Sequence, residues 1–159
     1  MDASVVWQGE MSFTGKADTG FEVPMGANPS VGGANDGFRP LELMAVSLAG
    51  CTAMDVISIL KKKRMHVSDY EVKVHTEQAD QHPMIMTSAV IEYHVSGNQV
   101  EEQAVLRAIE LSALRYCPAQ NMLAQIMPIT LKYFIYEEDH EGRALIISGE
   151  WSASATMQQ

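Results

Sequence analysis

The chain has 159 residues, of which 47% are hydrophobic and 19% are charged, a balance typical of one globular domain with a packed core. Its formal net charge of -9 excludes the basic surface that non-specific nucleic-acid binding requires, so we expect no nucleic-acid partner. The two cysteines are too few for a disulfide scaffold.

The first 36 residues are predicted to form strands followed by a glycine-rich loop. The segment SVVWQGEMSFTG alternates apolar and polar side chains, and GFEVPM continues that alternation after a turn at Asp18-Thr19-Gly20. The next segment, GANPSVGGANDGFRP, is rich in Gly, Asn and Pro and predicts a long loop. The first residues contain neither a basic nor a long apolar segment, so we expect no signal peptide and a cytoplasmic location.

A long helix is predicted from Arg39-Pro40 to about Arg64, because the pattern is helical over about 25 residues. Polar residues interrupt the apolar run between Leu41 and Leu60, which favours a buried helix over a membrane span. The helix is apolar nearly all round, so we expect burial on most of its faces. One small domain covers such a helix poorly, and a tightly associated homodimer is the hypothesis that follows.

The second half of the chain predicts strands on both sides of a helix pair. Alternation favours strands in DYEVKVHTE, MTSAVIEYHVSG, ITLKYFIYEE and RALIISGEW, the last two as a hairpin around DHEG. Between them, helices are expected over residues 100–115 and from Pro118 to about Ile126, and the tail 152–159 is expected to fray. The sequence therefore predicts an α+β fold, with antiparallel sheets around a long buried central helix.

Cys51 lies within the long helix, on a polar stripe that includes Ser47, Asp55 and Ser58 at helical spacing. Two interpretations stay open: a small hydrophobe in a core, or a nucleophile. A carboxylate at Asp55 would oppose a thiolate by like-charge repulsion, so a nucleophile would need a compensating cation.

Cys117 directly precedes Pro118, which suits the first position of a helix. Cys117 would then lie near the N-cap, where free backbone N–H groups stabilise a thiolate, and Arg115 is two residues away. The alternative is a capping cysteine without chemistry. Neither cysteine forms a CxxC motif, and the five histidines lack metal-ligand spacing, so no metal or cofactor is predicted.

Three segments together resemble the osmotically induced protein C (OsmC) family, which includes the organic hydroperoxide resistance proteins. They are GFRPLELMAVSLAGCTAMDVISILKKKRM, HPMIMTSAVIEYHVSGN and AIELSALRYCPAQNML, which keep the family order over about residues 37 to 123. The resemblance implies a single OsmC-like domain over residues 1–159 and an intertwined homodimer without membrane partners.

The resemblance also implies an activity, that of a thiol-dependent peroxidase acting on organic hydroperoxides in an antioxidant stress response. Cys51 matches the peroxidatic cysteine, and Cys117 matches the one that resolves its sulfenic acid as a disulfide. A dithiol or a lipoyl-bearing protein then regenerates the enzyme. The alternative is a non-catalytic small-molecule binder on the same scaffold.

Two positions depart from the family pattern. No arginine precedes Arg39, so Arg39 is the expected substitute for the activating cation, with Lys16 as another candidate. Leu41 occupies the place of the family glutamate, and Glu42 is the next residue along the chain. Asp55 is expected to orient groups or to take part in proton transfer.

Overall fold

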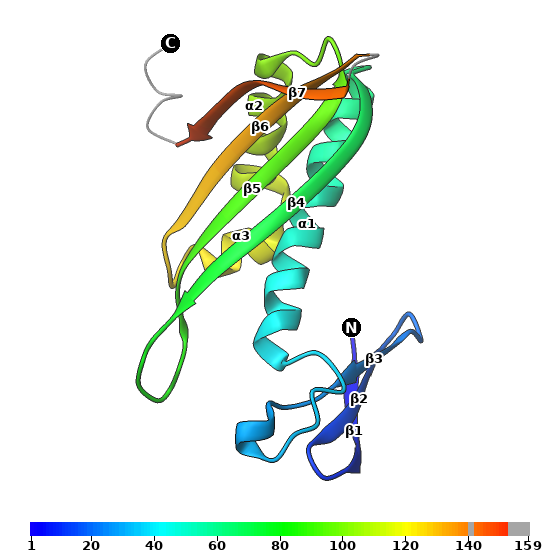
Figure 1. The fold of residues 1–159 in the computed structure, drawn as a ribbon, viewed down its shortest axis with the longest axis vertical. Coiled ribbons are helices and arrows are strands. Elements are labelled where there is room, and N and C mark those ends of the chain that lie inside the picture. Colours follow the sequence, from blue (N-terminus) through cyan, green and yellow to red (C-terminus); the bar gives the residue numbers. More distant parts are fainter. Residues whose placement is uncertain (140–141, 153–159) are drawn as a thin grey trace. The chain divides into compact units, whose positions relative to one another are not determined.

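The computed structural model describes residues 1–139 and 142–152 and divides into two compact units, residues 1–44 and residues 45–159. Figure 1 follows the elements of both units along the sequence. That residues 1–159 act as a single domain stays a prediction.

The first unit is a three-stranded antiparallel sheet with a loop beside it. Its strands are β1 (Ala3–Gly9), β2 (Ser12–Ala17) and β3 (Glu22–Met25), in the order β1-β2-β3. The alternating run expected from the sequence breaks after Gly9, since Gly9 and Glu10 adopt positive φ angles of 117° and 47°. The predicted loop contains a 3₁₀ turn, η1 (Pro29–Val31), capped by the side chain of Asn28.

The predicted long helix is confirmed as α1 (Pro40–Lys62). Its buried residues lie four apart in a single stripe: Leu48, Thr52, Val56 and Leu60. The expectation of burial on most faces is therefore wrong for one chain, and Val46 and Met54 are 54% and 68% exposed. By length and composition alone α1 could cross a membrane, a property that core helices of soluble proteins share.

The second unit contains a four-stranded sheet of β4 (His66–Gln78), β5 (Met86–Asn98), β6 (Ile129–Asp139) and β7 (Gly142–Trp151), in that order. The prediction of purely antiparallel sheets is wrong here, because β5 and β6 pair in parallel while β4–β5 and β6–β7 are antiparallel. Parallel neighbours need a crossover connection, which the helices between β5 and β6 supply. The predicted turn around DHEG and the predicted frayed tail fall largely on residues 140–141 and 153–159, outside the described residues.

The crossover consists of α2 (Glu102–Leu111), a π-helical turn η2 (Ser112–Tyr116) and α3 (Pro118–Leu123). Figure 1 shows α1 and α2 on the same face of the sheet. The predicted helix is confirmed from Glu102 to Leu111, and its inward face is apolar, since Val105, Ala108 and Ile109 are fully buried. The sequence predicted one continuous helix to Arg115 and missed the π-helical turn.

Candidate active site

Cys51 and Asp55 lie one turn apart on α1, and both side chains are half-buried. Residues four apart on a helix share a face, as the sequence predicted. The other members of the predicted polar stripe, Ser47 and Ser58, are exposed. The two ends of the stripe are therefore exposed, and Cys51 and Asp55 form its partly covered middle section.

Cys117 is fully buried and occupies the predicted N-cap of α3. Pro118 takes the first helical turn, and the N–H of Gln120 donates to Cys117 Sγ at 3.3 Å. The π-helical turn η2 ends immediately before it, with Cys117 N–H bonded to the carbonyl of Ser112 at 2.9 Å. Single π-helical turns occur often at functional sites, where they redirect the chain.

The fold brings the two cysteines together, although 65 residues lie between them in the sequence. Cys51 Sγ, Cys117 Sγ and a carboxylate oxygen of Asp55 all lie within 4.8 Å of one another. Both cysteines are free thiols. A disulfide requires sulfurs about 2.05 Å apart. The two sulfur atoms are therefore close enough to form a disulfide once their side chains move toward each other.

Burial raises the pKa of Cys117 to about 12, and the Cys51 sulfur adds to the shift as a hydrogen-bond partner. The N–H of Gln120 acts in the opposite direction but is outweighed. Cys117 therefore holds its proton at neutral pH and can offer it as a donor toward the Cys51 sulfur.

A chain of buried hydroxyl groups leads to Asp55. Tyr93 Oη lies 2.7 Å from Thr52 Oγ1, which lies 2.9 Å from Ser112 Oγ, and Ser112 Oγ donates to Asp55 Oδ2 at 3.1 Å. Each hydroxyl carries one proton, so the donation to Asp55 fixes the direction of the chain from Tyr93 through Thr52 and Ser112. All three hydroxyl residues are fully buried.

The sequence reasoning identified Asp55 but missed the three residues behind it. Thr52, Tyr93 and Ser112 come from α1, β5 and η2, and only their long-range packing unites them. Only Thr52 could have been found from the sequence, because it is a polar residue in the buried stripe of an otherwise apolar helix. Burial also raises the pKa of Tyr93, which keeps its hydroxyl protonated and able to donate.

The candidate cations have other partners. Arg39 Nη1 lies 2.6 Å from Glu42 Oε1 and Arg39 Nη2 donates to Asn35 Oδ1 at 2.9 Å, all within the first unit. The backbone N–H of Arg39 also donates to Glu42, and this bond is the main cause of the lowered pKa of Glu42. Lys16 pairs with Glu22 at 3.8 Å. The action of Arg39 or Lys16 on Cys51 stays a prediction.

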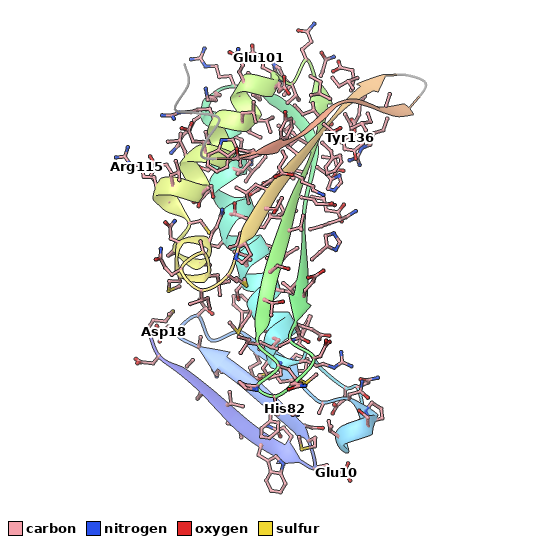
Figure 2. All side chains as sticks on the ribbon, turned by 90° about the vertical axis from the view of Figure 1, so that its left-hand side faces the viewer. Glu10, Asp18, His82, Glu101, Arg115 and Tyr136 are labelled. Carbon is pink, nitrogen blue, oxygen red and sulfur yellow. The ribbon has the colours of Figure 1, made fainter. Side chains whose placement is uncertain are left out.

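Arg115, two residues before Cys117, lies over the ring of Tyr116, with the guanidinium 5.5 Å from the ring centre. Figure 2 shows Arg115 on the helical side of the second unit, with its side chain directed outward. Arg115 is exposed, whereas Cys117 is fully buried, so this cation does not share the environment of the Cys117 sulfur.

Comparisons with known proteins agree on one family. The profile of the OsmC-like proteins matches residues 33–132. Protein YhfA of Escherichia coli K12 is 34% identical over 133 residues, which cover 84% of this chain and 96% of YhfA.

Two crystal structures extend the comparison to the fold. A hypothetical protein from Aquifex aeolicus VF5 is 28% identical with a TM-score of 0.75, over 87% of this chain and 97% of that one. An organic hydroperoxide resistance protein from Elizabethkingia anophelis is 18% identical with a TM-score of 0.61, over 84% of this chain and 92% of that one. The second likeness shows a shared fold.

Proposed function

Since this chain belongs to the OsmC-like protein family, we propose that it is a thiol-dependent peroxidase that reduces organic hydroperoxides to alcohols. One observation carries the proposal: the two cysteines, far apart in the sequence, meet with their sulfurs within 4.8 Å. An organic hydroperoxide resistance protein with the same fold supports this choice of reaction.

In the first step, the Cys51 thiolate attacks the outer oxygen of the hydroperoxide. An S–O bond forms, the O–O bond breaks, and the leaving alkoxide takes a proton to become the alcohol. Cys51 is the attacking residue because it is half-buried and accessible, whereas Cys117 is fully buried. The protonated Cys117 thiol stabilises the thiolate by donating toward its sulfur.

In the second step, Cys117 resolves the Cys51 sulfenic acid. The sulfur of Cys117 displaces hydroxide from Cys51, a disulfide forms, and the hydroxide leaves as water with the proton that Cys117 gives up. Asp55, whose carboxylate lies beside both sulfurs, is positioned to receive that proton on its way to water. An external dithiol or a lipoyl-bearing protein then reduces the disulfide by thiol–disulfide exchange.

The cation that supports the Cys51 thiolate is part of the proposal. Arg39 is our candidate and Lys16 the alternative, because a thiolate beside a carboxylate needs a compensating positive charge. Arg39 holds an exposed ion pair with Glu42, and the proposal requires its guanidinium to support the thiolate as well.

The chain is proposed to work as a homodimer. Apolar side chains remain exposed on α1 and around Cys117, namely Val46, Met54, Leu114, Tyr116 and Met122. We propose that these side chains form one interaction surface, since large exposed apolar patches mark such sites. A second copy of the chain would cover part of it and leave an apolar entrance, which favours alkyl hydroperoxides by about 0.8 kcal/mol per buried methylene.

We place the reaction in the cytoplasm, whose reducing conditions keep both thiols free. The activity is tested by adding cumene hydroperoxide to the reduced protein with excess dithiol and a metal chelator. Wild type and the control Ser58→Ala, changed at an exposed position of α1, should consume peroxide at equal rates, and Cys51→Ser should fall to the rate without protein.

Cys117→Ser separates the two steps. With excess cumene hydroperoxide and no external dithiol, we expect Cys51 of this variant to be over-oxidised to the sulfinic acid, because no thiol is left to resolve the sulfenic acid, whereas wild type stops at the disulfide. If wild type and Cys51→Ser consume peroxide equally slowly, the enzyme proposal fails. The non-catalytic small-molecule binder would then be the remaining candidate.

A further inference from the structure

The two cysteine sulfurs form a possible redox pair, and together with the carboxylate of Asp55 they also form a possible set of metal ligands. Among residues 1–139 and 142–152, they are the one group of three Cys, His, Asp or Glu residues whose ligand atoms all lie within 4.8 Å of one another. Two thiolates and a carboxylate suit Zn²⁺, which binds sulfur and oxygen with tetrahedral geometry. Neither cysteine spacing nor histidine spacing in the sequence indicates this group.

The distances fit a zinc ion after a small adjustment. Zn–S bonds of about 2.3 Å in a tetrahedral site place two sulfurs about 3.8 Å apart. The observed upper limit of 4.8 Å requires a closure of at most about 1 Å, which side-chain rotation can provide. A direct disulfide needs sulfurs about 2.05 Å apart, so from the same upper limit the metal site requires the smaller movement.

The donors also have the outer partners that metal sites use to orient their ligands. Ser112 Oγ donates to Asp55 Oδ2 at 3.1 Å and is itself held by the buried Thr52. The N–H of Gln120 donates to Cys117 Sγ at 3.3 Å. Such second-shell hydrogen bonds fix ligand orientation and contribute strongly to metal affinity.

We propose that the reduced chain binds one Zn²⁺ through Cys51, Cys117 and Asp55. The metal replaces the proton of each thiol, no electrons move, and two protons pass to water. Cys51 is half-buried, so the fourth position of the ion is open to a water molecule. The ligands come from α1 and from the N-cap of α3, both regular elements.

The site has a regulatory consequence that rests on the proposed function. Bound zinc occupies both sulfurs, so the metal-loaded enzyme cannot attack a hydroperoxide until the ion leaves. Conversely, oxidation by a hydroperoxide removes the site. Two electrons pass from the two thiolates to the O–O bond, and two protons are taken up to give the alcohol and water. The disulfide that forms cannot hold Zn²⁺. Peroxide and zinc therefore compete for one pair of sulfurs.

Zinc binding is measured on the reduced full-length chain by titrating Zn²⁺ against a chromophoric chelator. We expect one Zn²⁺ per chain in wild type and in Asp80→Asn, which changes an exposed carboxylate between β4 and β5. Affinity should fall at least about tenfold in Asp55→Asn. Cys51→Ser, Cys117→Ser and the disulfide form should bind none, with circular dichroism confirming that each variant is folded.

Co²⁺ gives an independent readout, because thiolate ligands produce charge-transfer absorption that carboxylates and water do not. That absorption should appear in wild type and vanish in either cysteine variant. No zinc uptake by the reduced wild type, or equal affinity in wild type and Asp55→Asn, would overturn the site; the second result would mean adventitious binding by a thiol pair.

The failure of this proposal is distinguishable from failure of the peroxidase. Zinc titration involves no peroxide, and turnover is measured with the metal removed by chelator. Active protein without zinc affinity refutes the site and leaves the enzyme, whereas zinc binding without turnover does the reverse. If both stand, added Zn²⁺ should suppress turnover in proportion to occupancy, and chelator should restore it.

Discussion

The two cysteines differ in how far each is withdrawn from solvent, and this difference fits the roles that we propose for them. Cys117 is fully buried and keeps its proton, while Cys51 is half-buried. A peroxidatic sulfur must meet the substrate, whereas a resolving sulfur must wait unoxidised. The burial of each cysteine therefore agrees with its proposed role.

Cys117 should impose a pH dependence on stability. Its pKa rises from 9.0 to about 12 on folding, so above about pH 9 the unfolded chain loses this proton while the folded chain keeps it. The contribution of the Cys117 thiol to the free energy of unfolding is complete below about pH 9. It is lost as the pH rises toward 12, at up to about 1.4 kcal/mol per pH unit. Urea unfolding of reduced, metal-free protein between about pH 8 and 11 should show a steeper decline in wild type than in Cys117→Ala.

Parallel declines in the two proteins would contradict that account of Cys117. The comparison is needed because burial also raises the pKa values of Tyr70, Tyr93 and Tyr133, and these tyrosines lower stability in alkaline solution in both proteins.

The buried hydroxyl chain makes a second prediction. Ser112→Ala leaves Thr52 and Asp55 without their shared partner, and a buried unsatisfied polar group costs about 1–3 kcal/mol. We expect the free energy of unfolding to fall by that amount in Ser112→Ala. The exposed Ser58→Ala should change it by less than about 0.5 kcal/mol, and equal effects would mean that the chain contributes nothing to stability.

At the level of elements, local patterns predicted most of the helices and strands. The N-cap at Cys117 was predictable because Pro118 is its neighbour. The parallel pairing of β5 with β6 and the π-helical turn η2 were not, because both depend on how the crossover packs. That Cys117 approaches Cys51 was predicted only from the family resemblance, since no local sequence pattern specifies a contact across so many residues.

The face of α2 that packs into the second unit should dominate its contribution to stability. Ile109 is fully buried, whereas Gln103 on the same helix is exposed. Removing a buried Ile side chain costs about 2–5 kcal/mol through lost burial and the cavity left behind. Thermal or urea unfolding should therefore show a large loss for Ile109→Ala and a change under about 0.5 kcal/mol for Gln103→Ala; similar losses would refute the packing of α2.

For the whole molecule, charge and exposed apolar surface act in opposite directions. The net charge of -9 opposes non-specific association, yet α1 keeps Val46 and Met54 exposed. Both features fit a protein that associates only with itself through one specific surface. On such a surface, complementary apolar contacts outweigh the repulsion between the negative charges of the two copies.

The homodimer proposal is tested by light scattering coupled to size exclusion. We expect wild type to have twice the chain mass, and Met54→Lys to shift toward the monomer because a buried unpaired charge is costly at an interface. Thr87→Lys, an equal charge change at an exposed position of β5, should leave the dimer intact. A monomeric wild type would remove this proposal.

The central claim is that Cys51 and Cys117 act together on a hydroperoxide. Reduced, metal-free protein is mixed with one equivalent of cumene hydroperoxide, quenched with an alkylating reagent and digested without reduction, and the cysteine peptides are identified by mass spectrometry. The account predicts a Cys51–Cys117 disulfide within one chain and the stoichiometric appearance of the alcohol. Intact peroxide with both cysteines recovered as alkylated thiols would contradict it.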